Sequence, residues 1–404
     1  MWPLWIALSV LVLLPIGRAS EAPLIVGAIA GLVLAWRQRA SLRADVGVRL
    51  AAIVFAFYWL AAFISAPGAI APEKSWSTVA ALLRFLPFAL FACLALRKAA
   101  WWPLLVDACA AVVVLWLLDA WVQIFTGWSL AGAETADRLS GIFGAGNLKL
   151  GPVLAVLSPF VFVAARRRWG WRGLVIAFAF QLMPILFAGS RSAWIMYALV
   201  ALAFAWMHTR APLRFAGWAL AAACVALLGM AAAWQHSGRF DVRVDRTLLA
   251  LQGSEQALDA ASAGRLRIWR TALAMSAAHP LAGVGVRGFR YAYPQYAQAG
   301  DAFVDVRTDE GAFHAHQIVL EVLSETGGTG LVLWIIGAVC AIRAWYRARA
   351  GARERALAPA LALAAMTFPL NTHLAFYSAW WGLLFWWLLA LYCAALGACD
   401  DESA

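Results

Sequence analysis

The sequence predicts an all-α integral membrane protein: a single polytopic domain over residues 1–404, with about twelve spanning helices and one long polar loop. Two observations lead to this fold class. Hydrophobic residues make up 64% of the chain and charged residues 13%, whereas apolar residues are about half of a soluble globular domain. Apolar segments close to the roughly 20 residues that a spanning helix needs also recur along the chain. Residues 235–312 are the one long hydrophilic interruption between them.

Each predicted span is a mostly apolar run bounded by polar or basic residues. The spans lie near residues 2–17, 22–36, 50–66, 76–96, 101–125, 149–165, 173–188, 193–208, 215–234, 313–342, 356–371 and 374–395. The first is interpreted as a spanning helix and not as a signal peptide, because it lacks a basic N-terminal region and a second apolar segment follows at once.

Basic residues are concentrated in alternate connections between the predicted spans. These connections are residues 37–49, 97–98, 166–172, 210–214 and 343–355. Short basic loops stay on the cytoplasmic side of a membrane. The pattern therefore predicts cytoplasmic termini and places residues 235–312 on the outer side. It also accounts for the net charge of +11 without nucleic-acid binding.

Two charged residues lie inside predicted spans. Arg84 and Asp119 are each roughly 10 Å below the outer ends of neighbouring antiparallel helices, at 1.5 Å of rise per residue. We expect them to pair, either as a structural ion pair or as part of a functional site.

The turn between the seventh and eighth predicted spans combines polar side chains with a helix start. If Ser192 caps the eighth helix, open backbone amides and the positive end of the helix dipole lie beside Arg191 and Ser190. Such a helix start is a candidate anion site. The alternative is a tight hairpin whose arginine contacts lipid headgroups.

A basic helical run opens in the long loop at Arg265 and extends to about Ala278, with Ser262 as the expected cap. Arg265 shares one face with Trp269, whereas Arg267 belongs to another face. Arg265 is then placed to reach inward. A solvated basic face explains the run equally well.

A glycine-rich stretch, residues 283–288, matches G-x-G-x-x-G. A dinucleotide site needs a preceding strand, and none is predicted here, so the glycines are expected to form a sharp turn. Three tyrosines follow, Tyr291, Tyr293 and Tyr296. They suit either stacking on sugar rings or a position at the membrane interface.

A histidine pair, His314 and His316, precedes the next apolar segment. With a helix starting near Phe313, His316 lies beside a polar stripe and His314 points to the opposite side. That stripe consists of Gln317, Glu321 and Glu325. Among the histidines, His316 is therefore the candidate for chemistry.

Nearby carboxylates raise a rival interpretation, a divalent metal site. Asp305, Asp309 and Glu310 precede the histidines, but the spacing fits no specific ligand pattern. No metal is predicted.

Five stretches together resemble the O-antigen ligase family, within the wider superfamily of O-antigen ligases and polymerases. They are R-L-S-G-I-F-G-A-G-N from Arg138, G-S-R-S-A-W from Gly189, Arg265-x-x-x-Trp269, P-L-A-G-V-G-V-R-G-F from Pro280, and A-H-Q-I-V-L-E-V-L-S-E-T-G-G-T-G from Ala315. The family commonly has His-Asn where this chain has His316-Gln317. Since glutamine keeps the amide, we expect little consequence.

The resemblance implies a GT-C-type glycosyltransferase of the bacterial inner membrane, with residues 235–312 in the periplasm. It would transfer O-antigen polysaccharide from undecaprenyl diphosphate to the lipid A-core oligosaccharide, inverting the anomeric centre without metal or other cofactor. Arg191 and Arg265 would hold the diphosphate, and His316 would be the catalytic residue. Further substrate contacts would come from Arg138, Ser192, Arg267, Arg287, Gln317, His314 and Tyr291.

Three alternatives stay open at this point. O-antigen polymerases and protein O-oligosaccharyltransferases are relatives, although the short connection between the last two predicted spans favours a ligase. A transporter or flippase of a lipid-linked saccharide would also need arginines in a membrane cavity. The sequence shows no corresponding broken helices in two halves, which many transporters have.

Overall fold

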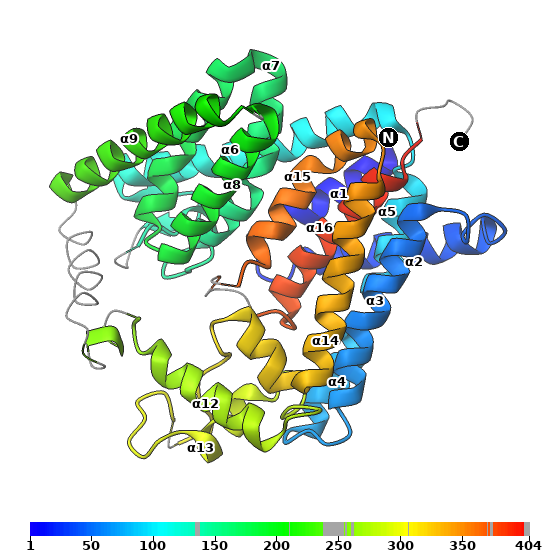
Figure 1. The fold of residues 1–404 in the computed structure, drawn as a ribbon, viewed down its shortest axis with the longest axis vertical. Helices are drawn as coiled ribbons and strands as arrows, with labels where there is room; N and C mark the ends of the chain where they lie inside the picture. The colour runs from blue at the N-terminus through cyan, green and yellow to red at the C-terminus, as the bar shows by residue number, and fades with distance from the viewer. Residues whose placement is uncertain are drawn as a thin grey trace.

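The computed structural model confirms a mostly helical integral membrane protein (Figure 1). It describes residues 1–133, 138–209, 211–236, 254, 257–259, 262–305, 307–369, 371 and 375–399. Within these residues, eight helical segments are long and apolar enough to cross a membrane. Each predicted span contains a helix, but α1, α2 and α15 are shorter than those eight.

The helices vary widely in length. They are α1 (Trp2–Val12), α2 (Glu21–Arg37), α3 (Val46–Ser65), α4 (Pro72–Leu82), α5 (Phe85–Ala95), α6 (Trp102–Thr126), α7 (Leu150–Phe187), α8 (Arg191–Thr209), α9 (Pro212–His236), α12 (Arg265–Ala278), α13 (Phe289–Tyr296), α14 (Ile318–Arg347), α15 (Ala350–Met366) and α16 (Ala379–Gly397). Two short 3-10 helices, η1 (Ala99–Trp101) and η2 (Gly141–Phe143), and a small hairpin of β1 (Trp128–Ser129) and β2 (Gly132–Ala133) complete the described elements.

Two predicted spans are the halves of one long element, α7. Its backbone breaks at Gly170, where φ is 63° and ψ is −147°. Only glycine adopts such a conformation without strain, so the chain can reverse here with no intervening loop. The predicted pair of helices, residues 149–165 and 173–188, is therefore present, but joined by a single-residue turn.

The last helix, α16, forms the centre of the bundle and packs against α3, α5 and α15. It is apolar on every side, as expected for a buried helix. Trp387 is fully buried and donates its indole N–H to the carbonyl of Ala7, at 2.8 Å. Trp386 stacks on Phe85 with ring centroids 5.8 Å apart. These contacts tie the C-terminal helix to the first helices of the chain.

Most of the described part of the predicted long loop belongs to a helical layer at one end of the bundle, here called the α12 layer. It consists of α12, α13 and the start of α14, and lies next to α4 in the lower part of Figure 1. Its own small core contains Ile268, Ala272, Met275, Val284, Phe289, Ala292, Tyr293, Ala312 and Ala315. Residues 237–253 of the predicted loop lie outside the described residues.

A tight turn, residues 283–287, fastens the α12 layer to the bundle. Ile70 donates its backbone N–H to the carbonyl of Val284 at 3.0 Å. The hydroxyl of Ser75 donates to the carbonyl of Val286 at 2.9 Å, and the N–H of Val286 donates to the hydroxyl of Ser65 at 3.1 Å. The glycines thus form a turn, as predicted, at the connection between α3 and α4.

Gly285→Ala should destabilise the protein by at least about 2 kcal/mol, because Gly285 has a φ of 98°. A Cβ there would also lie 2.2 Å from the Cβ of Ala69. Thermal unfolding of the purified variant measures the effect. Gly300→Ala is the matched control, since Gly300 has a φ of 75° but no atom within 4 Å of an added Cβ. Equal loss in both variants would show that the close approach contributes nothing.

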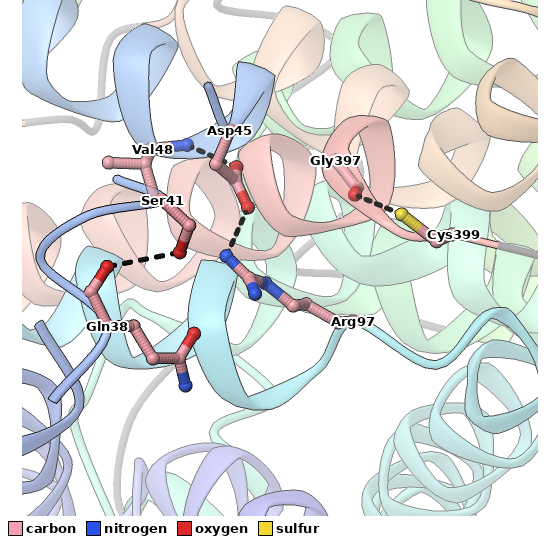
Figure 2. A network of polar contacts seen from close by, with 7 residues as sticks. All are labelled: Gln38, Ser41, Asp45, Val48, Arg97, Gly397 and Cys399. Atoms are coloured by element: carbon pink, nitrogen blue, oxygen red, sulfur yellow. Dashed lines mark hydrogen bonds and ion pairs between the residues drawn. The ribbon is translucent and has the colours of Figure 1, made fainter. Parts of the chain in front are cut away.

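At the opposite end of the bundle, basic connections contact half-buried acidic residues, and Figure 2 shows one of these, Asp45. Asp45 accepts the N–H of Val48 at the start of α3 and forms an ion pair with Arg97, both at 2.9 Å. Cys399, just after α16, donates its N–H to the carbonyl of Arg97. Near the start of α6, Asp107 pairs with both Arg167 and Arg168. The structure thus places these predicted same-side connections together, away from the α12 layer.

The predicted pair of Arg84 and Asp119 is wrong. Arg84 forms an ion pair with Glu21 of α2 at 2.9 Å, and Asp119 accepts the backbone N–H of Leu130 at 2.7 Å. The expected depth assumed one straight fourth helix, whereas the chain breaks between α4 and α5 at this arginine. A nearer carboxylate is also supplied by α2, which packs against α5.

Candidate active site

Three arginines far apart in sequence meet at the α12 end of the bundle. Burial lowers the pKa of Arg265 to about 10, and the positive charges of Arg191 and Arg138 contribute to this shift. All three side chains are half-buried. Cations held together in this way favour an anion with more than one negative charge. The structure thus brings together the two arginines predicted to bind diphosphate, and adds Arg138 to them.

Contacts between neighbouring segments explain how the three arginines come together. Leu139 donates its N–H to the carbonyl of Phe187 at 3.2 Å, which holds Arg138 beside the turn before α8. A Cβ on Gly151 would lie 2.9 Å from that of Ala188, so α7 and α8 begin side by side. Arg191 and Arg265 are the first residues of α8 and α12. Helix starts carry partial positive charge and open amides, which adds to the anion-binding character.

Both predicted helix caps are wrong by about two residues. Ser190, and not Ser192, precedes α8, and its hydroxyl oxygen accepts the N–H of Ala193 at 3.4 Å. Ser192 lies inside the first turn, with its hydroxyl 3.0 Å from that of Ser190. Gly264, with a φ of 78°, precedes α12, while Ser262 donates its hydroxyl to the carbonyl of Asp259. At the start of α12, a glycine turn therefore replaces the expected side-chain cap.

Lys149 is a further candidate for contacting an anion at this site, and it was not predicted from the sequence. It directly precedes α7, two residues before the glycine that approaches the turn at Ala188. Burial lowers the pKa of its ammonium group, which lies 4.4 Å from the ring centre of Trp380. A cation at a helix start opposes the helix dipole. That unfavourable placement was the signal available in the sequence.

The histidine pair lies before a helix and not on it. α14 begins at Ile318, and Gln317 caps it by accepting the N–H of Leu320. His316 has a φ of 52°, in the left-handed region. The expected start near Phe313 is therefore wrong, and so is the expected separation of the histidines. The rings of His314 and His316 lie 3.9 Å apart, because the non-helical backbone turns both to one side.

The histidines belong to the same layer as Arg265. They flank Ala315, which is fully buried in the core of the α12 layer. Ile268, one turn after Arg265, and Ala272 contribute to that core from α12. The first turns of α12 and the histidine segment are therefore held together by shared apolar packing.

The predicted polar stripe of α14 points into the protein. Glu321 and Glu325 are fully buried. Glu321 accepts the N–H of Phe376 at 2.7 Å, and Glu325 accepts the N–H of Arg287 at 2.8 Å. The positive charge of Arg287 also acts on both carboxylates. These residues thus fix the turn at residues 283–287 and the segment before α16 against the helix that follows His316.

The three tyrosines have different surroundings. Tyr293 is fully buried and donates its hydroxyl to Asp301 at 3.0 Å, while the hydroxyl of Tyr296 lies 2.8 Å from Nε2 of His279. Tyr291 instead lines an open cavity of about 830 Å³ beside the start of α4. The polar side chains Glu73, Lys74 and Ser77 line it too. Tyr291 therefore has room beside it for a saccharide.

The remaining charged candidates form ion pairs or hydrogen bonds within the α12 layer. Arg267 is on the exposed face of α12 and pairs with Asp259 at 3.0 Å. Glu310 pairs with Arg290, and Asp305 accepts the N–H of Arg307. Among the described residues, no three potential metal ligands come together.

One comparison with known proteins gives a family match. Residues 176–335 match a family model described as O-antigen ligase. The matched region contains Arg191, Arg265 and His316, whereas Arg138 and Lys149 precede it. A search of curated proteins found no match. The resemblance to the O-antigen ligase family that was predicted from the sequence is therefore confirmed over residues 176–335.

Proposed function

We propose that the protein is an inverting GT-C-type glycosyltransferase of the bacterial inner membrane. It transfers O-antigen polysaccharide from undecaprenyl diphosphate to the lipid A-core oligosaccharide on the periplasmic side. The observation that carries this proposal is the convergence of Arg138 with Arg191 and Arg265, the first residues of α8 and α12. A diphosphate carries the charge and the oxygens that such a cluster binds.

In the proposed reaction, the diphosphate of the donor lies between Arg191 and Arg265, and its polyprenyl chain stays in the bilayer. An acceptor hydroxyl attacks the anomeric carbon, and the bond from that carbon to the phosphate oxygen breaks. The arginines stabilise the charge that develops on the departing diphosphate. His316 accepts the hydroxyl proton or orients the hydroxyl, since an imidazole titrates near neutral pH.

The direct test uses purified protein in lipid vesicles with a defined undecaprenyl-diphosphate polysaccharide and defined lipid A-core. Joining of the two lipids, with release of undecaprenyl diphosphate, supports a ligase. Longer lipid-linked polysaccharide without lipid A attached would indicate a polymerase. Movement of the donor across the bilayer without sugar transfer would instead indicate a transporter.

Donor binding should weaken as the pH rises through about 10, because the pKa of Arg265 is lowered to that value by burial and by its two cationic neighbours. Below this pH the guanidinium is charged and binds the diphosphate, whereas above it the free site loses its proton and binding must recover one. Equilibrium binding of the lipid-linked donor across this range measures the effect. Arg265→Gln should remove this pH dependence, and a wild-type affinity that stays constant above pH 10 would contradict the assignment.

Tyr291→Ala should raise the KM for lipid A-core by about tenfold and change the KM for the donor little, as expected for loss of one aromatic contact to a sugar. The reason is its place beside the polar cavity at the start of α4. Initial rates with each substrate varied in turn give both constants. Tyr291→Phe keeps the ring and should stay close to wild type. A donor-specific effect would place the donor saccharide in this cavity instead.

A further inference from the structure

A second charged cavity, of about 630 Å³, lies at the end of the bundle opposite the α12 layer. α6, α7, α8 and α15 surround it. Its polar lining includes Arg166, Arg167, Arg355 and His208, with Glu354 as the one acidic residue among the lining residues. The cavity therefore combines a basic lining with a position between membrane helices. None of these residues belongs to the proposed transfer site.

Arg166 is the cation best placed to take an anion. Its Nε atom is buried and has no hydrogen-bond partner among the described residues. Its guanidinium stacks on Trp171 at 4.9 Å from the ring centre, which fixes its plane without using its hydrogen bonds. Arg167, by contrast, already has partners within the protein: it pairs with Asp107 and donates to the carbonyl of Pro103. A buried N–H without a partner costs free energy that a bound anion would recover.

Apolar surface lies directly beside these charges. Val106, Val163 and Phe204 line the same cavity. A smaller cleft between α7, α8 and α9 is lined only by hydrophobic residues, and these include Trp171, the residue under the guanidinium of Arg166. Phe162 of that cleft contacts Phe204 of the cavity, with ring centroids 5.7 Å apart. A ligand that joins a phosphate to a hydrocarbon chain matches this combination.

We propose that this cavity binds the phosphate of an anionic membrane phospholipid, with Arg166 as its main contact and an acyl chain along the apolar wall. Basic pockets between membrane helices commonly bind anionic lipid headgroups. The bound lipid would bridge α6, α7, α8 and α15 at this end of the bundle. The inference does not depend on the proposed transfer reaction, because it concerns other residues and another ligand.

Native mass spectrometry of the detergent-purified protein, titrated with phosphatidylglycerol, tests the proposal. Arg166→Gln should weaken binding about tenfold, the loss expected for one charge-assisted hydrogen bond. Arg168→Gln is the matched control: it removes the same charge two residues away, but Arg168 is exposed, pairs with Asp107 and does not line the cavity. It should leave the affinity within about twofold of wild type.

Val163→Phe gives a second variant that fills the cavity without changing its charge, and it too should weaken binding. Equal effects of Arg166→Gln and Arg168→Gln, in variants that unfold at the wild-type temperature, would overturn the proposal. Displacement of phosphatidylglycerol by inorganic phosphate in modest excess would also overturn it, since the cavity would then be a free-phosphate site. Binding of phosphatidylcholine as tightly as phosphatidylglycerol would contradict the requirement for an anionic lipid.

Discussion

Replacing Arg265 with glutamine is expected to lower the rate of polysaccharide transfer by about 10²- to 10³-fold, as when one preorganised donor to a developing negative charge is lost. Arg265 is half-buried at the first residue of α12, beside Arg191 and Arg138. Its charge is therefore unfavourable in the free protein and becomes favourable only when an anion is bound. Transfer measured with defined donor and acceptor lipids gives the effect.

The same substitution should leave the protein at least as stable as wild type, because it removes repulsion among three neighbouring cations. Thermal unfolding of the empty protein therefore separates a binding role from a structural one. Arg270→Gln is the matched control, since Arg270 lies on the same helix but is exposed. Loss of activity accompanied by a lower unfolding temperature in Arg265→Gln would contradict a role in anion binding.

Replacing His316 with asparagine should lower transfer by about 10²- to 10⁴-fold, the usual contribution of one general acid–base group. Asparagine is the informative replacement because His316 has a φ of 52°, and asparagine tolerates this left-handed conformation better than alanine does. The variant therefore removes the imidazole with little change in the backbone. Single-turnover transfer with bound donor measures the chemical step.

His314→Asn distinguishes the two histidines, whose rings lie 3.9 Å apart. If His316 is the group that acts on the acceptor hydroxyl, the loss in His314→Asn should be much the smaller of the two. Wild-type rates in His316→Asn, or a larger loss in His314→Asn, would contradict the assignment of the chemical role to His316.

Much of the fold could be predicted because the membrane restricts the chain so strongly. Every predicted apolar span contains a helix, since a backbone in the bilayer must satisfy its own hydrogen bonds. Basic connections that were predicted to share one side also form ion pairs at one end of the bundle, around Asp45 and Asp107. At the site, Arg191 and Arg265 were grouped from motifs alone and Arg138 was expected only as a further substrate contact, whereas the structure places its charge close enough to act on Arg265.

The errors arise where single residues redirect the backbone. The segment before α14 contains no proline or glycine next to the histidines, so nothing in the sequence indicated that His316 would adopt a left-handed conformation or that Gln317 would cap the helix. Arg84 was expected to meet Asp119 although Pro87, which removes a helix N–H, signals the break between α4 and α5. Its actual partner, Glu21, lies on the remote helix α2, and nothing near Arg84 in the sequence indicated that contact.

The most direct measurement is transfer by the purified protein from an undecaprenyl-diphosphate polysaccharide to lipid A-core in the presence of a metal chelator. We expect the wild-type protein to join the two lipids at its full rate, because arginines supply the charge at the diphosphate. Arg265→Gln and His316→Asn should lose this activity, while Arg270→Gln should keep it. Activity that the chelator abolishes and magnesium or manganese restores would contradict the role of the arginines, as would transfer at the wild-type rate by Arg265→Gln.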